Sequence, residues 1–257
     1  MLGKVRHEIE ALIYFLITNS GKNEPMQKHD LVITLRSELA SVKALRQAAK
    51  QDAATMAARV ALKTFQSERL AKTHADLIAG ADTHGAAQFF LQELYCPQDL
   101  TQRDSDVERI VPTLERLLPI AALQAITDAV ILDALSEKMD AAMADHLGQN
   151  FSEQEYIDAY RNQTSLGQRQ RQIALVNALG SSLCELVKIR FLSTTLVMMR
   201  GPARLAKLHG LQNFLERGFT TFKAMREPKA FVETVTRRES QILRKIFAQE
   251  PQPFRLD

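Results

Sequence analysis

Hydrophobic residues recur at spacings of three and four along most of the chain, a pattern typical of amphipathic helices. The segment 31–79 contains neither Gly nor Pro, and six apolar residues follow this spacing in its first half: Leu31, Leu35, Leu39, Val42, Leu45 and Ala49. No run alternates between apolar and polar residues, so a β-sheet is not expected. The pattern predicts an all-α fold, a multi-helix bundle.

The stretch from Gln168 to Arg200 departs from this pattern, because its apolar residues point in nearly every direction around a helix. A helix that is apolar on all sides either spans a membrane or lies at the centre of a bundle. Charged side chains would be costly inside a bilayer, and this stretch contains Glu185, Lys188 and Arg190. We therefore predict no membrane span and place the stretch as the central, mostly buried helix. Its closest crossing is expected at small residues: Ala178, Gly180, Ser181 and Ser182.

Interruptions of the helical pattern divide the chain into three parts. Residues 1–25 form a possible dispensable amino-terminal helix, since Met26 is an alternative start. Residues 26–80 form a long helical arm or hairpin, either one helix or two helices that divide near 51–55. Residues 81–250 form the core of the bundle.

Two helix starts can be placed within that core. Ser152 and Glu155 have the spacing of a capping box, in which the two residues satisfy each other's backbone N–H groups. Pro228 begins the last helix, because proline is favoured in the first turn. The residues after position 250 are expected to be loose.

Composition and charge narrow the class of protein. The chain has 257 residues, and a hydrophobic content of 46% with 25% charged residues excludes general disorder. Glu93 to Asp158 carries 14 acidic and 4 basic residues, whereas Arg161 to Asp257 carries 17 basic and 7 acidic residues. Leu31 to Ala79 is moderately basic, with 8 basic and 4 acidic residues.

This division of charge predicts a salt-sensitive association between the acidic stretch and the basic carboxyl-terminal half. The contact can lie within one chain, between two copies or with another protein, because opposite charges steer encounter in each case. We expect a protein partner or a homo-oligomer. Nucleic acid is an unlikely partner, since the basic residues are spread over several helices instead of one recognition element.

The cysteines indicate the compartment. Cys96 and Cys184 are too few for a disulfide framework, and both lie in apolar surroundings, so we expect buried free thiols in a reducing environment. The amino terminus lacks the charged start and long apolar core of a signal peptide. A cytoplasmic protein is therefore predicted.

No sequence motif points to a metal or a cofactor. None of the six histidines has an acidic residue three positions before it, so the Glu-x-x-His pairs of di-iron bundles are missing. The glycine-rich phosphate loops and the nucleophile elbow of hydrolases are missing as well. We expect no metal, no cofactor and no catalytic residue.

Two groups of residues are candidates for binding. Glu185 is an ionisable residue on the stretch predicted to be buried, which can mark a ligand pocket. Arg200, Arg204 and Lys207 surround the helix start at Gly201-Pro202, where free backbone N–H groups and cations suit an anion. His209 follows Lys207 by two residues and is the remaining candidate for lining a ligand pocket.

The leading functional hypothesis is a non-catalytic helical interaction or regulatory protein. The alternative is an enzyme or sensor that binds a small apolar or anionic ligand between helices, since helical bundles can hold such sites without a motif. A pocket that encloses Glu185 or His209 would favour this alternative.

Four segments carry a resemblance to a known family: SERLAKTHADLIA, AAQFFLQELYCPQDLTQRDSDVERIVPTLERLLP, LDALSEKMD and LQNFLERGFTTFKAM. The chain resembles an uncharacterised all-helical protein family of proteobacteria over residues 65–247. The resemblance implies a cytoplasmic bacterial helical protein and implies no catalytic residue, cofactor or substrate. Where the family pattern has Tyr-Gly-Pro this chain has Tyr95-Cys96-Pro97, so a glycine-type helix cap is not implied there.

Overall fold

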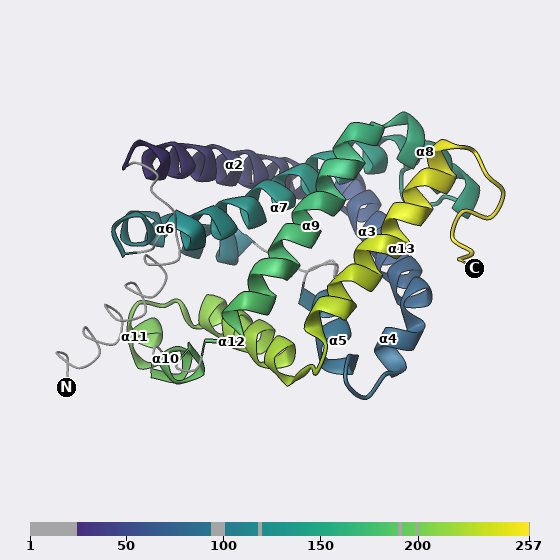
Figure 1. The fold of residues 1–257 in the computed structure, drawn as a ribbon. Helices are drawn as coiled ribbons and strands as arrows, with labels where there is room; N and C mark the ends of the chain where they lie inside the picture. The colour runs from purple at the N-terminus through teal and green to yellow at the C-terminus, as the bar shows by residue number, and fades with distance from the viewer. Residues whose placement is uncertain (1–24, 94–100, 118–119, 190–191, 199, 257) are drawn as a thin grey trace.

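The computed structural model describes residues 25–93, 101–117, 120–189, 192–198 and 200–256 and is all-helical within these ranges, without a strand. The predicted all-α bundle is thereby confirmed (Figure 1). The helix expected within 1–25 and the thiol of Cys96 lie outside the described residues. In chain order the helices are α2 (Pro25–Gln51), α3 (Ala53–Thr73), α4 (Ala75–Ala79), α5 (His84–Glu93), α6 (Thr101–Leu117), α7 (Ile120–Leu147), α8 (Glu153–Asn162), α9 (Leu166–Leu186), α10 (Leu192–Met198), α11 (Arg200–Leu205), α12 (His209–Ala224) and α13 (Pro228–Phe247).

The helix at the centre of the bundle is α7, which packs against α2, α3, α8 and α9. Figure 1 shows it between α2 and α9. In its second half, buried positions lie on nearly all sides of the helix: Ala134, Glu137, Met139, Asp140, Ala141, Met143 and Ala144. A helix surrounded by others needs apolar or paired residues all round, and α7 meets this condition.

The prediction of one mostly buried helix from Gln168 to Arg200 is wrong. The chain leaves the α-helix after Leu186, where the N–H groups of Lys188 and Ile189 bond carbonyls only three residues back, at 3.2 and 3.1 Å. Within α9, exposed residues recur at helical spacing, as in an ordinary amphipathic helix: Gln170, Ala174, Asn177, Ser181 and Glu185. Since this stripe faces solvent, α9 covers α7 and α13 from outside, and its buried residues are Arg169, Gly180 and Cys184.

One part of that prediction is confirmed at Gly180, which marks a close crossing of α9 and α13. A Cβ atom at Gly180 would lie 2.6 Å from Cγ1 of Val232 on α13, closer than packed carbon atoms approach one another. Glycine therefore lets the two backbones come together at this point. Ala178 and Ser181, which were expected at the same crossing, are exposed.

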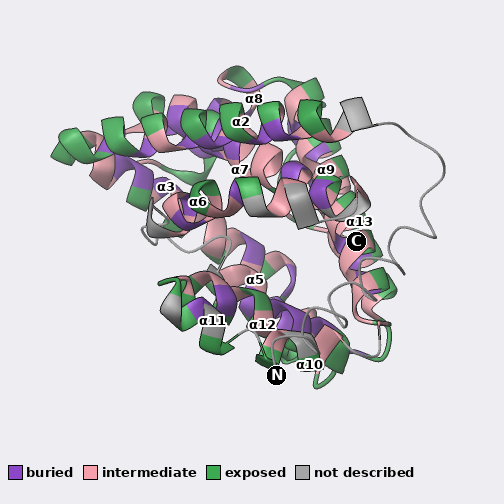
Figure 2. Cartoon of the chain, turned by 90° about the vertical axis from the view of Figure 1, so that its left-hand side faces the viewer, coloured by how far each residue is buried: buried purple, intermediate pink, exposed green. Residues whose placement is uncertain are grey.

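The segment 26–80 divides at Asp52, inside the predicted range, into α2 and α3, and it ends with the short helix α4. The carboxylate of Asp52 accepts the N–H of Thr55 at 2.8 Å and caps α3. Both helices pack against α7 and against each other. Figure 2 shows the buried side of α2 turned toward the bundle and its exposed side turned away.

The other predicted helix starts are also observed. Ser152 and Glu155 form the reciprocal hydrogen bonds of the capping box at the start of α8. Pro228 is the first residue of α13. Among the described helices, none combines the length and apolarity needed to cross a bilayer.

The carboxyl-terminal segment folds back onto the bundle, so the prediction of a loose tail is wrong. Pro253 is buried, and the ring of Phe254 lies 6.1 Å from that of Tyr156 on α8. Lys245 Nζ donates to the carbonyl of Arg255 at 2.8 Å. These contacts supply apolar burial and hydrogen bonds that keep the segment in place.

Candidate functional site

The residues predicted for ligand binding lie on the surface. Glu185 is exposed and pairs with Lys188 at 2.7 Å. Arg200 Nε and Nη2 donate to the carboxylate of Glu216 at 2.7–2.9 Å. The remaining candidates are exposed as well: Arg204, Lys207 and His209. Because Glu185 and His209 are open to solvent, neither lines an enclosed cavity, and anion binding at the basic residues stays a prediction.

A buried ion-pair network joins α2 and α3 to α6 and α7. Arg46 on α2 bonds Asp104 on α6 and Asp133 on α7, the latter at 2.8 Å. Glu137 on α7 accepts from Arg59 at 3.0 Å and from Lys63 at 2.9 Å. The acidic stretch therefore finds its buried partners in the basic segment 31–79, instead of the predicted carboxyl-terminal half.

The spacing of these residues is the signal by which the network could have been recognised. Three basic or amide residues of α3 follow a spacing of four and three, namely Arg59, Lys63 and Gln66, and they bond two acidic residues of α7 that lie three positions apart, Glu137 and Asp140. Side chains so spaced share one face of a helix. Two complementary polar faces at matching intervals predict that the helices pack side by side.

Burial sets the protonation behaviour of the network. Burial alone would raise the pKa of Glu137, but the charges of Lys63, Arg46 and Arg59 outweigh it and hold this pKa below its ordinary value. At Asp104 the effect of burial is the larger one, and its pKa is raised despite Arg46. Because each buried charge has partners of opposite sign, the network fixes how the helices pack.

A second polar cluster surrounds Glu239 on α13. Arg69 Nη1 donates to both carboxylate oxygens of Glu239 at 2.7 Å, and His74 Nε2 lies 3.0 Å from Oε1. Burial would raise the pKa of Glu239, but the charge of Arg69 and the hydrogen bonds of His74 and Arg69 lower it to about 2. The cluster thus ties α3 to the last helix and holds Arg69 in a fixed orientation.

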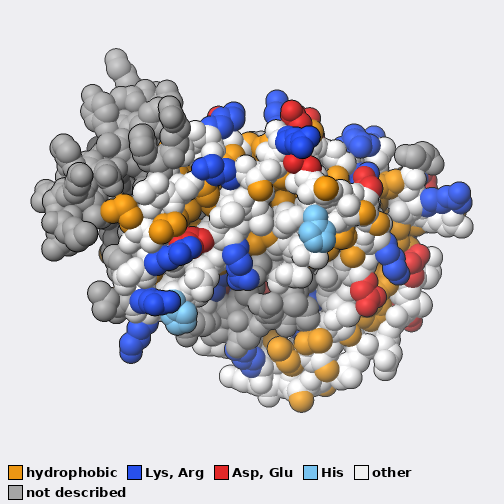
Figure 3. All heavy atoms as spheres, turned by 90° about the horizontal axis from the view of Figure 1, so that it is seen from below, with side chains coloured by type: hydrophobic (Ala, Val, Ile, Leu, Met, Phe, Trp, Pro, Cys, Tyr) orange, Lys and Arg blue, Asp and Glu red, His pale blue; other side chains and the backbone are white. Residues whose placement is uncertain are grey.

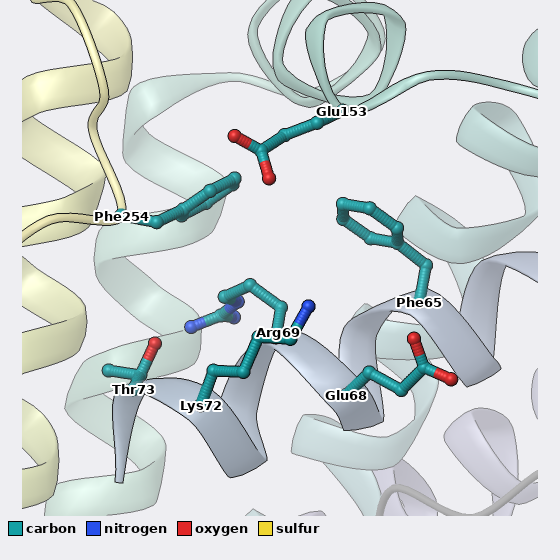
Figure 4. Close-up of a pocket in the computed structure, with 7 residues that line it drawn as sticks. All are labelled: Phe65, Glu68, Arg69, Lys72, Thr73, Glu153 and Phe254. Carbon is teal, nitrogen blue, oxygen red and sulfur yellow. The ribbon is translucent and has the colours of Figure 1, made fainter. Parts of the chain in front are cut away.

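Arg69 forms the floor of a surface cleft of about 140 Å³ between α3, the start of α8 and the carboxyl-terminal segment. Phe65 and Phe254 form two opposite walls, and the guanidinium carbon of Arg69 lies 5.8 Å from the centroid of the Phe254 ring. Lys72 and Glu153 reach into the cleft from opposite sides (Figure 4). We call this site the Arg69 cleft.

Exposed apolar side chains concentrate on two contacting helices, α10 and α12. Val197 is 51% exposed, Met198 is 42% exposed and Leu215 is 46% exposed. We call these three residues the α10–α12 face. Both helices lie at the lower edge of the molecule in Figure 1, and the view from that side shows hydrophobic side chains between lysines and arginines (Figure 3).

Groups able to hold a metal ion are missing from the described part of the chain, where no three His, Cys, Asp or Glu side chains gather in a suitable arrangement. Cys184 is a free, buried thiol whose pKa is raised by burial and by the neighbouring Glu185. The thiol is therefore poorly suited to act as a nucleophile.

A comparison with known protein families finds one relationship. The family described as "Domain of unknown function (DUF8198)" matches residues 45–253, which include the ion-pair network, the α10–α12 face and most of the Arg69 cleft. No curated protein and no solved structure matches the chain. The description of the matching family assigns no activity, so function must be inferred from the geometry.

Proposed function

The chain belongs to the family described as Domain of unknown function (DUF8198), and we propose that it is a non-catalytic helical interaction protein that binds a partner protein through the α10–α12 face. In this proposal it works in the cytoplasm of a bacterium, for which the free buried Cys184 is support. The partner is either a second copy of the chain or another helical protein.

The observation that carries the proposal is the concentration of exposed apolar side chains. Six large hydrophobic side chains are more than a third exposed among the described residues, and three of them form the α10–α12 face. Grouped apolar side chains on a surface are typical of contact sites, whereas isolated ones are not. Lys223 on α12 donates to Ser193 on α10 at 2.6 Å and so places a cation beside the face, which favours a partner with an apolar centre and an acidic rim.

The face is held on a rigid frame, which suits recognition. Gln212 on α12 donates to the carbonyl of Leu196 on α10 at 2.7 Å and so joins the two helices. Behind them, Gly218 fits against Phe89 of α5, where an added Cβ would lie 2.9 Å from the ring. A preformed surface loses less conformational entropy on binding than a mobile one.

The alternative hypothesis, an enzyme or sensor with a ligand at Glu185 or His209, has less support because both residues are exposed. The carboxylates of the ion-pair network already bond cations of the same chain, so they hold the helices together and do not offer a ligand site. A small-molecule site at another position remains compatible with an interaction protein.

The proposal is tested with the substitutions Met198→Glu and Leu215→Glu, which place a charge on each of the two helices of the face. The matched control is Ile33→Glu on α2, where the side chain is equally exposed at 54% but lies outside the face. Native mass spectrometry of the protein purified from its source, together with sedimentation at several concentrations, measures the bound partner or second copy.

We expect the wild type and Ile33→Glu to retain the associated species and the two face variants to lose it. Retention by Met198→Glu and Leu215→Glu would contradict the proposal. A wild type that sediments as a monomer and carries no bound protein would contradict it as well.

A further inference from the structure

We propose that the Arg69 cleft binds a small zwitterion with an aromatic side chain, of the class of free aromatic α-amino acids. This inference is independent of the α10–α12 face, because the cleft is built from other elements. It lies between α3, the start of α8 and the segment after α13.

The charged groups at the rim of the cleft are available to a ligand. Lys72, Glu68 and Glu153 are exposed and make no hydrogen bond or ion pair within the described part of the chain. Lys72 and Glu153 nevertheless face each other across the opening (Figure 4). Two opposite charges that face one another without pairing leave a gap that a molecule with both charges can bridge.

The balance of charge favours a zwitterion over a simple anion or cation. The cleft is lined by the cations Arg69 and Lys72 and by the anions Glu68 and Glu153. Arg69 is already bound to Glu239, so Lys72 is the cation left to receive a carboxylate. A simple anion would also meet the charges of Glu68 and Glu153, and a simple cation would leave Lys72 without a partner. An ammonium group at Glu153 and a carboxylate at Lys72 satisfy the two groups that face each other, and Glu68 stays in solvent.

The walls and the size of the cleft define the rest of the ligand. Phe65 and Phe254 stand on opposite sides, where they can contact both faces or edges of an aromatic ring. The volume of about 140 Å³ is smaller than the ~300 Å³ at which sites for drug-sized molecules begin. A single amino acid is of suitable size, whereas a nucleotide is too large.

The surrounding structure holds these groups in place before a ligand binds. Phe65 packs against Phe151 and Tyr156, with ring centroids 5.5 and 4.4 Å away. Phe254 is fixed by the buried Pro253 beside it and by its contact with Tyr156. Such preorganisation is characteristic of binding sites.

The experiment uses the full chain and L-phenylalanine as the probe, followed by amide chemical shifts in NMR titrations. Two analogues each lack one charge: 3-phenylpropanoate lacks the ammonium group, and 2-phenylethylamine lacks the carboxylate. The variants are Lys72→Gln and Glu153→Gln, which remove one charge each from the rim. Lys188→Gln and Glu185→Gln are the matched controls, because they alter an exposed pair at the end of α9 outside the cleft.

We expect saturable shifts at residues of the cleft with L-phenylalanine, and affinity about tenfold lower for each analogue and each rim variant, as one charge-assisted hydrogen bond implies. The α9 variants should bind like the wild type. Circular dichroism shows whether the rim variants are folded. No shift at millimolar L-phenylalanine, or an analogue that binds as tightly as L-phenylalanine, would refute the inference. Since Met198→Glu and Leu215→Glu leave the cleft unchanged, a failure here is distinct from a failure of the proposed interaction.

Discussion

Replacing Glu137 by Gln tests whether the ion-pair network stabilises the fold. The carboxylate of Glu137 is only 6% exposed and is surrounded by three cations: Arg59 at 3.0 Å, Lys63 at 2.9 Å and Arg46 at 3.5 Å. Glutamine has nearly the same volume, so the substitution removes charge without opening a cavity. The side chains of Arg46 and Arg59 are 9% and 8% exposed, and they would lose a partner while still buried.

We expect the variant to lose ~3 kcal/mol of unfolding free energy, at the lower end of what breaking a buried pair costs, since Gln can still accept one hydrogen bond. Urea unfolding at neutral pH measures the difference. The pKa of Glu137 is held below its ordinary value. Its contribution is therefore present above that ordinary value and falls as the pH decreases through the lowered pKa.

The control is Glu233→Gln, which removes an equivalent charge from an exposed pair with Lys229 at 3.7 Å. That variant should differ from the wild type by less than ~0.5 kcal/mol. The double variant Arg59→Gln with Glu137→Gln should cost less than the sum of the single variants, because the two residues interact directly. If Glu137→Gln is as stable as the control, the network does not carry the packing of α2 and α3 on α7.

Three further predictions concern the carboxyl-terminal part. Gly180→Ala should lower the free energy of unfolding in urea by ~1–3 kcal/mol through its clash with Val232. Adding Val232→Ala should remove most of that loss. If the loss caused by Gly180→Ala is the same with Val232→Ala as without it, the clash lies elsewhere. The pKa of Glu239 is about 2 against an ordinary 4.5, so the stability that its carboxylate contributes is complete above pH 4.5 and is lost as the pH falls toward 2. In this pH range the melting temperature of Glu239→Gln should therefore depend less on pH than that of the wild type. An equal dependence on pH in both proteins would contradict this prediction. Phe254→Ala should cost ~2 kcal/mol, below the value for a fully buried ring, whereas a loose tail would show no loss of stability.

The sequence alone determined the class of fold and several helix boundaries. Spacings of three and four identified the helices, and the local chemistry of Ser152 and Pro228 located two of their starts. These features depend on residues within one or two turns of each other, so they can be read from neighbouring positions. Gly180 was one of four small residues expected at a close crossing, and the structure is needed to show that the crossing lies there, since Ala178 and Ser181 are exposed.

Only the tertiary structure decided which helix lies at the centre and where the sites are. An apolar helix gains from burial against any neighbour, so the pattern in Gln168–Arg200 could not show that α7 takes the central place. The pairing of the acidic stretch with 31–79 depends on which faces meet, and net charge does not specify a face. The Arg69 cleft joins side chains of α3 and α8 to Phe254. Along the chain, Phe254 lies more than a hundred residues after Phe65 on α3. Such a site exists only after packing has brought these segments together.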